Sequence, residues 1–137
     1  MCGLLTLKKR QCHTAPMHLL APDGEYNIPF LRKYLPDEEI VLVCVAEREQ
    51  GLISREGATL DDLPALRYAN RQKGSGTRLL LDYLLKERGV DPALIRGYER
   101  EFTTHLGVAF AVRSGEATAA WVCIRPRRAS LRPHRGT

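Results

Sequence analysis

The spacing of apolar and polar residues along the chain predicts an alternation of helices and strands. The most regular helical pattern covers residues 79–88 and ends at Gly89, and a more apolar helix is expected over residues 103–114. Such alternation indicates an α/β fold. Shorter helices are expected at residues 3–11, 28–35 and 59–63, and strands at residues 13–20, 39–46, 66–69 and 117–124.

Residues 39–46 give the clearest strand signal in the chain. Their continuous run of β-branched and other apolar residues predicts a strand that is buried on both faces. The pattern continues through the polar residues 47–50 into a second apolar stretch at residues 51–54. A long strand with a polar middle is expected to cross between two lobes.

A glycine-rich loop at residues 70–78 joins the strand expected at residues 66–69 to the most regular helix. Glycines in such a loop allow left-handed backbone angles and close approach to a ligand. The first turn of a helix has unpaired N–H groups, which favour a negative group together with the helix dipole. Hydroxyl and cationic side chains add further donors, so the loop predicts an oxyanion site. The relevant residues are Asn70, Arg71, Lys73, Gly74, Ser75, Gly76, Thr77 and Arg78.

This loop has two alternative interpretations. It could be a plain strand-to-helix connection in which Ser75 or Thr77 caps the helix. A nucleotide-binding P-loop fits less well, because its GxxxxGK[ST] spacing needs an earlier glycine before Gly74 and a lysine after Gly76. Anion binding without a magnesium–nucleotide apparatus fits these residues best.

His105 begins the second long helix and is expected to act as a second anion donor facing the Gly74 loop, with a surface or capping histidine as the alternative. Glu99 and Glu101 lie in a charged connection, where solvated side chains are the simpler interpretation. The chain shows neither a nucleophile arrangement nor metal-ligand spacing. We therefore expect no catalysis, no metal and no cofactor, although a phosphate-ester enzyme using Glu99 or Glu101 stays open as an alternative.

The net charge of +5 does not by itself indicate nucleic-acid binding. Residues 1–124 contain equal numbers of basic and acidic residues, so the excess lies in the five arginines of residues 125–137. This tail is expected to be disordered, because its prolines and arginines offer little to a core. Four scattered cysteines indicate reduced thiols, and together with the absence of an apolar run of membrane-spanning length they predict a cytoplasmic protein.

Several segments of the chain resemble one known family. The sequence is similar to the periplasmic-binding-protein-like domain of cytosolic molybdate-binding and molybdate-responsive regulator proteins. The resemblance implies an α/β, periplasmic-binding-protein-like fold with two lobes and a small oxyanion, nominally molybdate or tungstate, in the cleft between them. The matching segments are Gly3–Arg10, His18–Leu20, Gly24–Asn27, Arg48–Leu52, Asn70–Arg78, Gly97–Glu101 and Thr103–Leu106.

The resemblance also suggests roles for residues and partners. Ser75, Gly76 and Thr77 are expected to donate to the anion, Arg78 to balance its charge, and Asn70 and Arg71 to shape the loop. Many relatives carry the domain after a helix-turn-helix module, which makes a separate or fused DNA-binding partner the expected context. A DNA-associated subunit without its own ligand is the alternative, and a homodimer stays open.

The chain departs from the family pattern at both ends. Relatives have an earlier strand and helix before the segment that matches Gly3, and a glycine-containing segment where this chain has residues 118–124. We therefore expect an incomplete first lobe at residues 1–46, a second lobe at residues 47–124 with the anion loop, and the basic tail at residues 125–137. A shift of reading frame near Thr118 is one hypothesis for the second departure.

Overall fold

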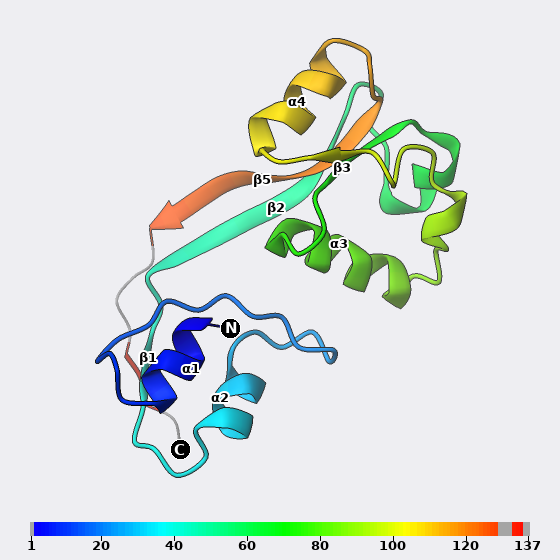
Figure 1. The fold of residues 1–137 in the computed structure, drawn as a ribbon. Coiled ribbons are helices and arrows are strands. Elements are labelled where there is room, and N and C mark those ends of the chain that lie inside the picture. Colours follow the sequence, from blue (N-terminus) through cyan, green and yellow to red (C-terminus); the bar gives the residue numbers. More distant parts are fainter. Residues whose placement is uncertain (1, 129–132, 136–137) are drawn as a thin grey trace. The chain divides into compact units, whose positions relative to one another are not determined.

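The computed structural model describes residues 2–128 and 133–135, which fall into two compact units (Figure 1). The first unit is Met1–Leu42 with Pro133–Thr137, and the second is Val43–Arg132. The division between Leu42 and Val43 lies close to the expected lobe boundary after residue 46.

The first unit contains two short helices and a small sheet. Helix α1 (Cys2–Lys8) packs against α2 (Ile28–Tyr34), and β1 (Val41–Val43) pairs with β6 (Pro133–Arg135). The strand expected at residues 13–20 is wrong: these residues form a loop with one isolated bridge, between Leu20 and Tyr26. The Asn27 side chain accepts a hydrogen bond from the Leu19 amide (2.9 Å). The backbone groups at the end of this segment are therefore satisfied locally, without a neighbouring strand.

The apolar run at residues 39–46 is not buried as predicted. It is divided between β1 and the start of β2 (Ala46–Ser54), and Val41, Val43 and Val45 are 64%, 47% and 84% exposed. Burial of both faces requires covering layers, and the two-stranded sheet of β1 and β6 is too small to supply them within its own unit. The run therefore reflects strand propensity alone.

The second unit is built on a mixed four-stranded sheet. Its order is β2, β5 (Ala119–Arg128), β3 (Tyr68–Arg71) and β4 (Glu101–Phe102). Strand β5 is antiparallel to β2, whereas β3 is parallel to both β5 and β4. The mixed sheet with its helices confirms the α/β fold class.

Helices α3 (Gly76–Glu87) and α4 (His105–Arg113) cover opposite faces of this sheet. Successive residues of a strand point to opposite faces, and Tyr68 packs in the cluster with α3 whereas Ala69 packs in the cluster with α4. The α3 side also buries Leu81 and Leu85, one helical turn apart. Burial of each leucine stabilises the fold by about 1.5–3 kcal/mol. The remaining buried residues are Leu60, Leu63, Ile95, Ala119 and Trp121 on the α3 side, and Val108, Ala111, Val112, Ala117, Ala120 and Val122 on the α4 side.

The two long helices were predicted correctly from their patterns. Ser75 caps α3 by accepting a hydrogen bond from the Arg78 amide (3.2 Å), and Thr104 caps α4 by accepting one from the Gly107 amide (2.9 Å). Two short 3-10 helices, η1 (Leu60–Ala65) and η2 (Pro92–Leu94), complete the unit.

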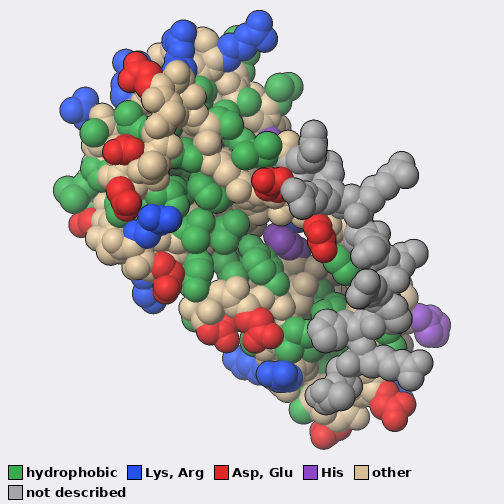
Figure 2. All heavy atoms as spheres, turned by 180° about the vertical axis from the view of Figure 1, so that it is seen from behind, with side chains coloured by type: hydrophobic (Ala, Val, Ile, Leu, Met, Phe, Trp, Pro, Cys, Tyr) green, Lys and Arg blue, Asp and Glu red, His purple; other side chains and the backbone are tan. Residues whose placement is uncertain are grey.

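Strand β5 extends beyond the expected lobe boundary at residue 124. Its residues 125–128 pair with residues 46–49 of β2, and the register shifts between Glu49 and Gln50. In the rest of the tail expected to be disordered, residues 133–135 form β6, and residues 129–132 and 136–137 lie outside the described residues. Figure 2 shows basic and acidic side chains interspersed on the face in view, with apolar side chains between them.

Candidate functional site

The candidate site lies where β3 ends and α3 begins. Gly74 has φ +84°, and a Cβ added there would meet nothing within 4 Å. The glycine is thus required by the backbone angle and not by lack of space. The Ser75 amide donates to the Gln72 carbonyl (3.2 Å), which closes the turn just before the helix.

The start of α3 presents free backbone donors. The hydroxyl and carbonyl oxygens of Ser75 accept from the amides of Arg78 and Leu79, at 3.2 and 3.0 Å. Within the described part of the chain, the amides of Gly76 and Thr77 have no acceptor. The Thr77 side chain is buried. Ser75 therefore serves as the helix cap, and the next two amides are available to a ligand.

Asn70 holds the end of β3 in place. Its side chain is buried, donates to the Tyr98 carbonyl (2.9 Å) and accepts from the Arg71 amide (2.9 Å). Both ends of its amide group are thus used inside the protein. This position agrees with a role in shaping the loop.

Arg78 is surrounded by partners within the protein. Its guanidinium is buried, with Nη1 2.7 Å from Glu101 Oε1 and 3.3 Å from the Arg71 carbonyl, and Nε 3.9 Å from Asp82 Oδ2. Its Cζ also lies 4.6 Å from the centre of the Tyr98 ring. The positive charge of Arg78 is therefore balanced by the protein's own carboxylates.

Arg71 is a buried cation whose guanidinium is incompletely paired within the described chain. It is 9% exposed; its Nε donates to Gln72 Oε1 (3.3 Å) and its Nη2 to the Thr103 carbonyl (3.2 Å). Its Nη1 is buried and has no partner among residues 2–128 and 133–135. Burial of the guanidinium lowers the pKa of Arg71.

His105 adds a donor at the start of α4. Its Nδ1 accepts from the Cys123 amide (3.5 Å), which leaves the proton of a neutral imidazole on Nε2. Burial lowers the pKa of His105, and the charges of Arg71 and Arg48 lower it further. The structure thus brings His105 and Arg71 into one electropositive region.

Sequence reasoning missed two residues beside this region. Arg48 lies in β2, and its positive charge contributes to lowering the pKa of His105. Gln50 has a buried Oε1 without a partner in the described chain. Gln50 lies opposite Cys123, whose amide contacts His105. Both belong to the segment Arg48–Leu52 of the family resemblance, but only strand pairing places them near α4.

The chain matches the model of the PBP superfamily domain over residues 1–132. The chain belongs to this family. It is also 36% identical over 125 residues to the uncharacterized protein YvgK of Bacillus subtilis (strain 168). The matched region covers 85% of this chain and 41% of YvgK. The chain therefore spans about two-fifths of the length of this curated relative. Membership of this family supports ligand binding as the function of the domain. The expected truncation stays a prediction.

The described residues do not meet the requirements of a membrane-spanning helix or of a metal site. No helix there is long and apolar enough to cross a membrane, and no group of side chains there could hold a metal ion. The four cysteines are free thiols.

Proposed function

We propose that the protein binds a small tetrahedral oxyanion of the molybdate or tungstate class at the carboxyl end of β3. The ligand lies among Arg71, the amides of Gly76 and Thr77, and His105. This end of a parallel strand pair is where ligands of open α/β sheets usually bind. The domain would act as the sensing part of a regulator in the cytoplasm.

The observation that carries the proposal is the buried Nη1 of Arg71 without a partner. A buried N–H donor that loses its hydrogen bond to water costs about 1–3 kcal/mol, and more when it is charged. A bound oxyanion would supply the missing acceptor and the missing negative charge together. Because Arg71 also contacts Gln72 and Thr103, its guanidinium is already held in one orientation.

The surrounding groups favour a small anion with several oxygens. Two free amides come from the start of α3 and one imidazole N–H comes from the start of α4, so the donors belong to two different helices. Arg48 adds charge at longer range. A tetrahedral dianion accepts hydrogen bonds from several directions, which a planar carboxylate does less well.

Binding is favoured over turnover of a phosphate ester. Glu101, one of the two acids that an enzyme would need nearby, forms a 2.7 Å ion pair with Arg78. Its carboxylate is therefore already engaged within the protein. Glu99 is exposed. We propose that ligand binding is signalled to a helix-turn-helix DNA-binding partner, as the resemblance to molybdate-responsive regulators suggests, and that the domain does not convert its ligand.

A thermal-shift panel with molybdate, tungstate, sulfate and phosphate tests the proposal. Wild type should gain stability with molybdate or tungstate, by about 2.7 kcal/mol at a hundred times the dissociation constant. Arg71→Met should lose this gain, and the control Arg88→Met should keep it, because Arg88 lies at the far end of α3 and pairs with Asp61. No shift in folded wild type with any of the four anions would refute the proposal.

A further inference from the structure

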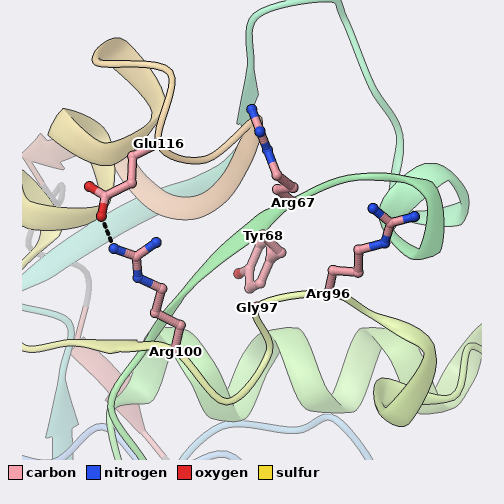
Figure 3. A pocket seen from close by; sticks show the side chains of 6 residues that line it. All are labelled: Arg67, Tyr68, Arg96, Gly97, Arg100 and Glu116. Atoms are coloured by element: carbon pink, nitrogen blue, oxygen red, sulfur yellow. Dashed lines mark ion pairs between the residues drawn. The ribbon is translucent and has the colours of Figure 1, made fainter.

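A second concentration of arginines lies at the other end of β3. A hollow of about 260 Å³ is lined by Arg67, Tyr68, Arg96, Gly97, Arg100 and Glu116 (Figure 3). Arg67 immediately precedes β3, whereas Arg71 is its last residue. At about 3.3 Å per strand residue, the backbones of Arg67 and Arg71 lie roughly 13 Å apart. The hollow is thus distinct from the proposed oxyanion site.

The backbone brings the walls of this hollow together. Arg67 and Arg96 form a parallel bridge, and the Tyr68 amide donates to the Arg96 carbonyl (2.8 Å). Gly97 has φ +86°, and a Cβ there would lie 2.1 Å from the Tyr68 carbonyl oxygen. Only glycine permits so close an approach, so the loop that carries Arg96 is pressed against the start of β3.

The charges of the hollow do not cancel. Arg100 forms an ion pair with Glu116, drawn as a dashed line in Figure 3. The Arg67 guanidinium donates to the Gly115 carbonyl (3.1 Å), and neither Arg67 nor Arg96 forms an ion pair with any residue of the described ranges. The lining thus contains three arginines and one glutamate, which leaves two positive charges without an ionic partner.

We propose that this hollow binds the phosphate group of a small organic phosphate monoester. A phosphate monoester carries close to two negative charges at neutral pH, which matches the unbalanced charge. Guanidinium forks suit phosphate oxygens, and the three arginines come from separate positions around the hollow. A carboxylate would bring one negative charge and two oxygens, so it is the poorer match.

Glu116 sets the strength of this site. Its carboxylate holds Arg100 in the unliganded protein and repels an incoming phosphate. Binding of the phosphate requires Arg100 to exchange a carboxylate oxygen for a phosphate oxygen. Removal of the Glu116 charge should therefore strengthen binding, whereas removal of an arginine charge should weaken it. Opposite effects from neighbouring side chains would not result from a change in folding.

Calorimetric titration of the full chain with phenyl phosphate tests the proposal. Arg96→Gln should weaken binding by about tenfold or more, as expected for loss of a charge-assisted hydrogen bond, and Glu116→Gln should strengthen it. The exposed-arginine control Arg88→Gln and the variant Arg71→Met should bind as wild type does. Circular dichroism should show that all four variants are folded.

The outcomes separate this site from the oxyanion site. Absence of phenyl phosphate binding at millimolar concentration would overturn the proposal, and so would equal binding of acetate. Binding lost in Arg71→Met but kept in Arg96→Gln would place the phosphate at the oxyanion site and also overturn it. Failure of molybdate and tungstate to bind would leave the phenyl phosphate result unaffected, because the two sites have no residue in common and are tested with different ligands.

Discussion

Replacement of Arg78 by methionine should destabilise the second unit, because Arg78 belongs to the protein's own ion-pair network. The substitution keeps a long, flexible side chain of similar reach but removes the guanidinium. It breaks the 2.7 Å contact with Glu101, the 3.3 Å bond to the Arg71 carbonyl and the stacking on Tyr98 at 4.6 Å. Asp82 loses its weaker 3.9 Å partner as well.

The magnitude follows from these contacts. Loss of one partner of a fully buried ion pair costs about 3–5 kcal/mol. The carboxylates of Glu101 and Asp82 are 36% and 37% exposed, so water recovers part of that cost. A cation–π contact adds about 0.5–1 kcal/mol. We expect a loss of about 2–3 kcal/mol in the free energy of unfolding of this unit.

Urea unfolding followed by Trp121 fluorescence measures this change. Trp121 is the only tryptophan in the chain and is buried in the core beside α3, so its signal reports on the second unit alone. With a slope of about 1.5–2 kcal/mol per molar urea, the midpoint should fall by about 1–2 M. The urea midpoint of Arg78→Lys should lie between those of wild type and Arg78→Met, because lysine keeps the positive charge but lacks the planar guanidinium. A loss below about 0.5 kcal/mol for Arg78→Met would refute this reasoning, since such a value is typical of an ordinary surface site.

Two further predictions concern His105 and Gly97. Because the folded state lowers the pKa of His105, it binds fewer protons than the unfolded state, and stability without ligand should fall as pH decreases through about 6.5. A bound anion should raise the pKa of His105, so tungstate should bind more tightly at pH 6 than at pH 8, roughly the range in which histidine titrates. Calorimetric titrations measure this difference, and an equal pH dependence in His105→Gln would contradict the prediction. Gly97→Ala should cost at least about 2 kcal/mol in urea unfolding, because alanine must adopt φ +86° and its Cβ would overlap the Tyr68 carbonyl; wild-type stability would show that the loop can move aside.

The local features of the second unit could be predicted from the sequence. Helical spacing and capping residues predicted α3 and α4, and the glycine-rich loop before α3 is where it was expected. These features depend on residues that are close in the chain. Strand β4 could not be predicted in the same way, because Glu101 is held there by pairing with β3 and by Arg78.

The roles of the two buried arginines depend on contacts between distant residues. Arg78 resembles a ligand-binding cation in the sequence, but Glu101 and Asp82 balance it in the fold. Arg71 resembles a loop residue, but its guanidinium extends toward Thr103 and ends in an unpaired donor. Helical spacing places Asp82 four residues after Arg78, but it does not indicate the closer partner Glu101, which lies on β4. The exposure of Val45 is a similar case, since propensity does not specify what covers a strand.

A crystal structure of the protein with tungstate tests the central claim most directly, because the anomalous scattering of tungsten locates the anion without reference to any side chain. The account predicts one strong peak at the carboxyl end of β3, with ligand oxygens in hydrogen-bonding reach of Arg71 Nη1 and the Thr77 amide. A tungsten peak elsewhere, with Arg71 Nη1 paired to a protein group or to water alone, would contradict it.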